Sequence, residues 1–257
     1  MIPAIWRRHA DVLVALARSD LRIRYGRGAW QLVKWLIDPF ALVGIYLLLR
    51  VILDRSGESV ALTLACSVVP FQIVLLSAMS ALTAVSLREP ILLNMRFDRM
   101  LIPPASVLTE SLAFAASFLM FPIAMAFYGI GPTLALLWLP VVIAATLLLA
   151  LGVAWPAALI GLWFPSITVF AGQLLRILYF AAPGLVALSE VSPEVREWMV
   201  WNPLTGLFES FRHVFLYGNA PEFWELAYPA GVGLVLMLLF VPVYRREQRH
   251  FAKLVHG

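Results

Sequence analysis

Six stretches of this sequence are apolar over about 20 residues, the length at which an α-helix crosses the hydrocarbon core of a membrane. They are Trp30–Leu53, Val60–Leu87, Ala105–Tyr128, Pro140–Trp163, Ile167–Leu188 and Leu226–Tyr244. The chain is 62% hydrophobic and only 13% charged, whereas soluble domains are about a quarter charged. One water-facing globule cannot bury so much apolar surface. We therefore expect an all-α integral membrane protein.

Basic residues set the expected orientation of these spans. Lys34, Asp38 and Arg50 interrupt the first stretch. Whether this stretch crosses the membrane is therefore decided from the distribution of basic residues along the chain. Most of the basic residues flank the six stretches: Arg7, Arg8, Arg18, Arg22, Arg24 and Arg27 before them, then Arg245, Arg246, Arg249 and Lys253 after them. Because basic segments stay on the cytoplasmic side, both termini belong there. The number of crossings must then be even, which predicts six.

The first 29 residues read as a helix that lies on the membrane rather than across it. Leu13, Ala17 and Leu21 recur at helical spacing, while Arg18 and Arg22 line another face. Such a helix places arginines among anionic headgroups and its apolar stripe at the acyl boundary. Two interpretations stay open: a simple orienting anchor, or an anchor whose polar face also binds a cytoplasmic partner.

The connection at residues 189–225 contains two helix starts. Ser192-Pro193 and Asn202-Pro203 each place a capping side chain before a proline, and Gly218 is suited to end the second helix. Glu209 and Arg212 are three residues apart and can pair on one face. We expect a re-entrant outer helical hairpin that dips into the outer leaflet beside a polar path, where a gate would lie. The alternative is an interfacial loop without a gating role.

The connection LREPILLNMRFDRMLIPP, residues 87–104, alternates basic and large apolar residues. An apolar stripe exposed on the cytoplasmic side normally has a covering partner, although the stripe could also lie on the lipid surface.

No phosphate-binding G-x-x-x-x-G-K-[ST] motif occurs in the chain. Its four histidines are scattered, and no pattern of metal ligands is present. We therefore expect no catalytic residue, no metal and no cofactor bound by this chain.

Three stretches carry a resemblance to a known family. They are ALARSDLRIRYGRGAWQLVKWLIDPF, the connection ending in MLIPP, and WNPLTGLFESFR. Their order and spacing resemble those of the membrane permeases of type-2 ATP-binding-cassette exporters, which move capsule, O-antigen and teichoic-acid polysaccharides. The resemblance covers essentially the whole chain.

The resemblance implies a transport permease of the bacterial inner membrane without an ATPase site of its own. Two copies would form a homodimer, and two ATPase subunits holding ATP and magnesium would dock from the cytoplasm. The substrate would be a lipid-linked glycan, with membrane lipids and a possible periplasmic adaptor as further partners, and no nucleic acid. The chain would be one transmembrane domain, 1–257, with segments 1–29, 30–188, 189–225, 226–244 and 245–257.

The same resemblance implies roles for individual residues. The outer gate would include Asn202, Pro203, Glu209 and Arg212. The ATPase-docking surface would include Arg18, Arg22, Arg88, Glu89, Arg96, Phe97, Asp98 and Arg99.

One residue within the predicted spans is unusual on physical grounds. Arg176 lies in the fifth apolar stretch, where an arginine costs about 3 kcal/mol or more unless it faces a partner or water. Gln173, Tyr179 and Phe180 lie nearby in the sequence. Aromatic rings stack on sugars and arginine binds phosphate or carboxylate, so we expect a substrate path lined by Arg176, Gln173, Tyr179 and Phe180, with Tyr46 and Phe71 as weaker candidates. The alternative is that Arg176 pairs with an acid such as Glu110 and only holds helices together.

Other function classes fit the sequence less well. A type-2 ATP-binding-cassette exporter of drugs or lipids is the nearest alternative. A membrane-embedded glycolipid transferase needs clustered acids or a histidine base, and none is evident. A scaffold subunit has little use for a buried arginine.

Overall fold

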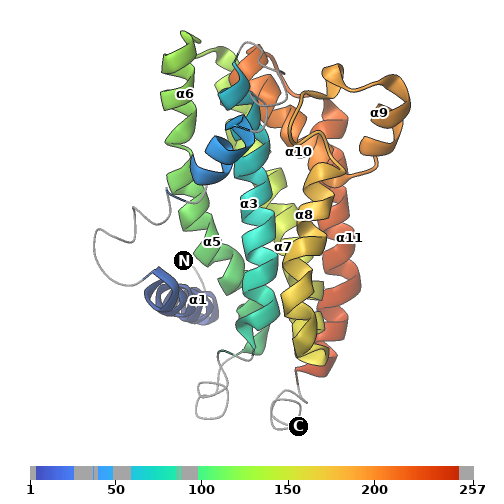
Figure 1. Ribbon diagram of the computed structural model, residues 1–257. Helices are drawn as coiled ribbons and strands as arrows, with labels where there is room; N and C mark the ends of the chain where they lie inside the picture. Colours follow the sequence, from blue (N-terminus) through green and yellow to red (C-terminus); the bar gives the residue numbers. More distant parts are fainter. Residues whose placement is uncertain are drawn as a thin grey trace.

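The computed structural model describes residues 4–25, 37, 40–48, 59–85, 87 and 98–248. All regular elements in these ranges are helical, which confirms the expected all-α class. Most of the helices run side by side in one bundle, and α1 lies across its flank (Figure 1). The α-helices are α1 (Ala4–Tyr25), α3 (Val60–Ala84), α5 (Ile102–Ser117), α6 (Met120–Tyr128), α7 (Leu139–Trp163), α8 (Thr168–Phe180), α9 (Pro193–Met199), α10 (Pro203–Arg212) and α11 (Phe223–Glu247). The short elements are the 3₁₀ turns η2 (Arg99–Leu101), η3 (Leu134–Trp138), η4 (Pro165–Ile167) and η5 (Leu188–Glu190), and the π-helical turn η6 (His213–Tyr217).

Four helical stretches in the described residues are long and apolar enough to cross a membrane. They are Val60–Ala84, Arg99–Tyr128, Leu134–Trp163 and Phe223–Glu247. Each coincides with one of the spans expected from the sequence, namely the second, third, fourth and sixth. The chain is therefore built as a multi-pass membrane protein.

The other two expected spans are not matched in full. The fifth contains a shorter helix than expected, and the first is described only in part. The fifth was expected at Ile167–Leu188, but α8 ends at Phe180 and the next seven residues are not helical. Pro183 and Gly184 explain the shorter helix, because proline lacks the amide proton that a helix interior needs and glycine disfavours helix. Of the first span, Trp30–Leu53, only residues 37 and 40–48 are described, and they are helical.

Helix α3 is the centre of the bundle. It packs against α5, α7, α8 and α10 (Figure 1). In its most apolar 18-residue window 89% of the residues are buried, compared with 11% for α11. Small hydroxyl residues in α3 suit this central position, because they can bond a carbonyl one turn earlier, as Thr63 does by donating to the carbonyl of Ser59. The apolar face of α11 that remains exposed is available to lipid.

Glycines bring the central helices into close contact. A Cβ atom on Gly161 of α7 would lie 1.8 Å from the carbonyl oxygen of Leu82 in α3. A Cβ atom on Gly152 of α7 would likewise lie 2.5 Å from the carbonyl oxygen of Gly233 in α11. Backbones can approach this closely only where side chains are absent. These two crossings fix α7 between α3 and α11.

Replacing Gly161 by alanine should therefore destabilise the protein. The new methyl group would push the backbones of α3 and α7 apart, and overpacking of this kind costs about 1–3 kcal/mol. The matched control is Gly231→Ala in α11, where a Cβ atom meets nothing within 4 Å. Thermal unfolding in detergent should show a lower midpoint for Gly161→Ala and an unchanged or higher one for Gly231→Ala. Equal midpoints would contradict this description of the α3–α7 crossing.

Candidate functional site

The segment that the sequence predicted to be an outer re-entrant hairpin contains two short helices, α9 and α10, of which α10 is buried. Its position at the outer face stays a prediction. Asn202 caps α10 by accepting a hydrogen bond from the Leu204 amide at 3.0 Å, and its side-chain amide donates to the Leu178 carbonyl of α8 at 2.7 Å. Ser192, which was also expected to cap a helix, makes no such bond. Pro193 still begins α9, because its fixed φ suits the first helical position. All residues from Leu204 to Arg212 are buried.

Glu209 and Arg212 form the ion pair that their spacing indicated, and they form it inside the protein. The Arg212 guanidinium lies 2.5 Å from the Glu209 carboxylate, and the side chain of Arg212 is 0% exposed. Arg212 also donates to the carbonyl of Pro183 at 2.7 Å. The Glu209 carboxylate accepts from the amide of Leu188 at 3.0 Å. The pair therefore binds both ends of the irregular segment that follows α8.

The same segment is held from its other side by hydroxyl groups. The hydroxyl of Tyr179 donates to the Gly184 carbonyl at 2.9 Å, and the hydroxyl of Ser67 in α3 bonds the same oxygen at 2.5 Å. A Cβ atom on Gly184 would lie 2.6 Å from the Tyr179 ring, so only glycine fits there. The segment after α8 is thus fixed between α3 and α10.

His213 connects the end of α10 to the start of α11. One ring nitrogen lies 3.1 Å from the Glu225 carboxylate, and the other lies 2.5 Å from the side-chain oxygen of Asn219. Two acceptors suit a doubly protonated ring. The hydrogen bond to Glu225 raises the pKa of His213 to about 9, with Asn219 and the charge of Glu209 acting in the same direction and burial acting against them. The turn closes at Gly218, whose φ is 68°.

The structure separates the six residues expected to line a substrate path into two groups. Gln173, Arg176 and Phe180 are exposed on α8, and Arg176 donates to Gln173 at 3.4 Å. Tyr179 and Phe71 are buried, and Tyr46 is partly buried. The Tyr179 ring stacks on Tyr46 at 5.3 Å and lies 4.8 Å from Phe71. The alternative partner Glu110 is buried in α5.

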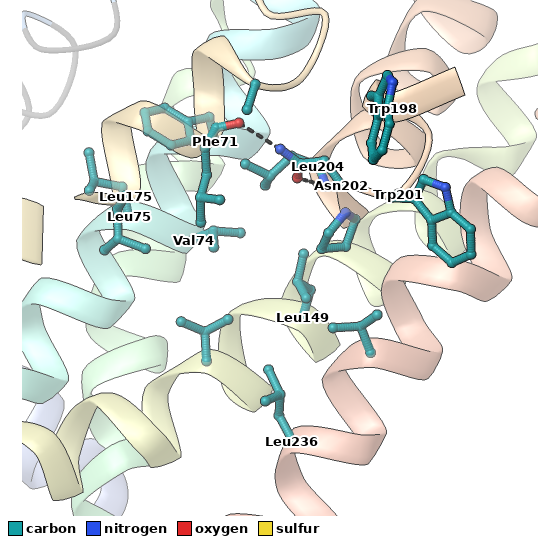
Figure 2. Close-up of a pocket in the computed structure, with 15 residues that line it drawn as sticks. Phe71, Val74, Leu75, Leu149, Leu175, Trp198, Trp201, Asn202, Leu204 and Leu236 are labelled. Atoms are coloured by element: carbon teal, nitrogen blue, oxygen red, sulfur yellow. Dashed lines mark hydrogen bonds between the residues drawn. The ribbon is translucent and has the colours of Figure 1, made fainter. Parts of the chain in front are cut away.

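A cavity of about 470 Å³ lies between α3, α7, α8, α11 and the α9–α10 turn. Figure 2 shows Phe71, Val74 and Leu75 on one side of it, with Trp198 and Trp201 at the opposite rim and Leu236 at the far end. Its walls are almost entirely apolar, and Asn202 is the polar side chain that reaches it.

The expected docking residues are described only in part. Arg18 and Arg22 are exposed on α1, which packs against α5. Asp98 caps η2 by accepting from the Met100 amide. Arg99 donates to the carbonyl of Gln248 at 2.5 Å, and Tyr244 donates to the carbonyl of Arg99 at 3.4 Å. These bonds join the connection before α5 to the end of α11. Arg88, Glu89, Arg96 and Phe97 lie outside the described residues.

Sequence reasoning missed the partners of the outer residues. The carbonyl of Pro183 lies 29 residues before its partner Arg212, and the amide of Leu188 lies 21 residues before its partner Glu209. Both are backbone groups, so their side chains give no signal of the contact. The one available signal was the dipeptide Pro183-Gly184, which favours a helix end over a helix interior. His213 and Glu225 were not connected, because a turn separates them in the sequence.

Replacing Glu209 by glutamine should strongly destabilise the protein. Glutamine keeps an oxygen for the Leu188 amide but leaves the buried charge of Arg212 without a counter-ion, a change that costs about 3–5 kcal/mol. The matched control is Glu197→Gln on the exposed face of α9. The thermal midpoint in detergent should fall for Glu209→Gln alone. If both variants melted together, the buried pair would not hold the structure.

Stability should also depend on pH through His213. Folding raises its pKa from 6.5 to about 9, so its contribution to stability is complete below pH 6.5 and is lost as the pH rises towards 9. The free energy of unfolding should decline over this range, and His213→Gln should flatten the decline. Melting curves at several pH values test this. An unchanged slope in the variant would contradict the assignment.

Comparison with known proteins finds sequence similarity to export permeases. No family model matches the chain. Two proteins of Klebsiella pneumoniae named O-antigen export system permease protein RfbA are 24% and 23% identical to it, each over 95% of both chains. A protein of the same name from Myxococcus xanthus is 26% identical over 96% of both chains. Over nearly its entire length the chain is therefore similar to the permeases of O-antigen export systems, as its sequence motifs indicated.

Proposed function

We propose that this chain is the transmembrane subunit of an ATP-driven exporter that moves a lipid-linked polysaccharide from the cytoplasm across the inner membrane. In this proposal it crosses the membrane six times with both termini in the cytoplasm. Two copies form the conduit, and two ATPase subunits with ATP and magnesium drive it from the cytoplasmic side. The chain itself performs no chemistry.

The observation that carries the proposal is the extent of the similarity to permeases. The similarity covers 95–96% of this chain and of each relative. It therefore includes the membrane helices, the segment at residues 189–225 and the connections between helices. The four described spans support it, because they coincide with four of the six spans expected from the sequence. Nothing specific favours export of drugs or the transferase reaction over this function.

The inner surface offers a physical route for the partner's action. Arg99 and Tyr244 join the connection before α5 to the end of α11 through two hydrogen bonds. α1 packs against α5 and against η2. A subunit that presses on α1 or on the connection at residues 87–104 would therefore act on α5 and α11 together.

The exposed polar stripe on α8 supports the proposed path. Arg176 and Gln173 are exposed on a helix whose other exposed residues are mostly apolar. An arginine facing hydrocarbon costs about 3 kcal/mol or more, so this face fits a wet conduit better than lipid. With Phe180 it presents one charge, one amide and one ring, which suits a sugar polymer with anionic groups.

Arg176→Ala should lower polysaccharide export while leaving assembly with the ATPase intact. Loss of one charge-assisted hydrogen bond, about 1.5–3 kcal/mol, corresponds to a roughly tenfold or larger effect. Arg176→Lys keeps the charge and should retain more export than alanine. Surface polysaccharide and co-purified ATPase are the two measurements. Unimpaired export by the alanine variant would exclude Arg176 from the path.

The function as a whole is tested by affinity purification from the native membrane. We expect an ATP-binding-cassette ATPase and a glycolipid to be recovered with the chain, and we expect the glycolipid to stimulate ATP hydrolysis. Stimulation by small amphiphiles without glycolipid would instead identify an exporter of drugs or lipids. ATP hydrolysis by the purified chain alone would contradict the proposal.

A further inference from the structure

The cavity beside α9 has walls that select an apolar occupant. Apart from the indole N–H groups of Trp198 and Trp201 at the rim, Asn202 has the one polar side chain among its lining residues. That side chain is already used, since its oxygen accepts from Leu204 and its nitrogen donates to Leu178. A pocket with such walls takes up apolar groups in preference to polar ones. Below the rim, the side chains of the lining therefore offer no free hydrogen bond to a sugar or an ion.

The depth of the cavity corresponds to one leaflet of a membrane. Tyr228 of α11 donates to the carbonyl of Trp201, which sets the level of the rim. The cavity extends along α11 to Leu236 (Figure 2), eight residues further and about 12 Å deeper at helical rise. The hydrocarbon half of a bilayer is about 15 Å thick. Tryptophans at the rim fit the same position, because they concentrate where headgroups meet hydrocarbon.

The volume of the cavity matches one hydrocarbon chain. It measures about 470 Å³. This volume lies within the range of about 300–1,000 Å³ usual for sites that hold one small ligand, so the cavity suits one hydrocarbon chain rather than a whole lipid.

The cavity lies on the opposite side of α8 from the proposed substrate path. At about 3.6 residues per turn, Gln173, Arg176 and Phe180 fall on one side of the helix. Leu175 and Leu178, which line the cavity, fall on the other side. An occupant of this cavity is therefore separated from the path by α8, which points to a membrane lipid rather than to the transported glycan.

The charge at the rim selects among membrane lipids. Glu190, Glu194 and Glu197 are exposed on η5 and α9. The one arginine between them, Arg196, donates to the carbonyls of Ser189 and Val191. Because α9 also contributes Trp198 to the cavity lining, these charges make the surface next to the rim acidic overall, which disfavours an anionic headgroup. A zwitterionic headgroup, with its ammonium turned towards these carboxylates, complements it.

We propose that this cavity binds one acyl chain of a zwitterionic phospholipid from the outer leaflet, with phosphatidylethanolamine as its headgroup class. The lipid fills the space between α8 and α11 and supports α9 from below. The inference rests on the membrane orientation and the substrate path proposed above, but not on which glycan is transported.

Native mass spectrometry of the full-length chain tests this site. The chain is reconstituted in vesicles with equal amounts of phosphatidylethanolamine and phosphatidylglycerol, then released in detergent. We expect one phosphatidylethanolamine to stay bound per chain. Val232→Trp fills the cavity and should reduce retention at least about tenfold, a loss of about 1.4 kcal/mol. Leu239→Trp, on the exposed face of α11, is the matched control and should retain the lipid.

Tryptophan fluorescence of the chain with its native Val232 gives an independent measurement. Phosphatidylethanolamine with a brominated acyl chain should quench tryptophan fluorescence more than brominated phosphatidylglycerol does. The difference should vanish when Trp198 and Trp201 are both replaced by phenylalanine.

The proposal would be overturned by equal quenching by the two lipids. It would also be overturned by retention of phosphatidylglycerol or an isoprenoid lipid, or by equal retention of lipid in the Val232→Trp and Leu239→Trp variants. Closure of the cavity by a second copy of the chain, seen as a cross-link between cysteines placed at Val232, would overturn it as well.

Discussion

The ion pair between Glu209 and Arg212 is the interaction on which the outer half of the structure depends. Two charges inside an apolar bundle are stable only if they are paired and their remaining donors and acceptors are used. Here the backbone of the segment after α8 supplies those partners, through the Pro183 carbonyl and the Leu188 amide. The pair therefore fixes the position of a chain segment that could not hold itself by regular hydrogen bonding, and it fixes α10 to that segment in return.

This arrangement divides the outer hairpin into a fixed part and a peripheral part. α10 is buried and bound to α8 through Asn202 and to α11 through His213. α9 instead makes sparse contacts with the other helices and exposes Trp198 at 79%. If the outer segment moves during transport, α9 is the helix whose movement breaks the fewest contacts. The apolar cavity beneath it lies where such a movement would occur.

Much of the fold follows from the sequence, because membrane thickness sets the length of an apolar helix. That constraint predicted α3, α7 and α11, and local chemistry predicted the Asn202 cap, the Gly218 turn and the spacing of Glu209 and Arg212. The end of α8 was missed, since a proline within a membrane helix is tolerated when neighbours satisfy the backbone. The apolar length of the stretch therefore outweighed the signal of Pro183-Gly184 for a helix end. The partners of Arg212 and His213 were also beyond reach, because tertiary packing brings together residues that no sequence spacing connects. The orientation of Tyr179 towards Ser67, away from the exposed stripe of Arg176, is a similar consequence of packing.

The central claim is that buried charge makes α10 a fixed part of the bundle. Hydrogen–deuterium exchange on the full-length chain in a lipid bilayer tests it most directly, because amides exchange only when their hydrogen bonds open. The account predicts that the amides of Leu204–Arg212 exchange among the slowest in the chain, while those of Val195–Met199 exchange quickly. Exchange in α10 as fast as in α9 would contradict it.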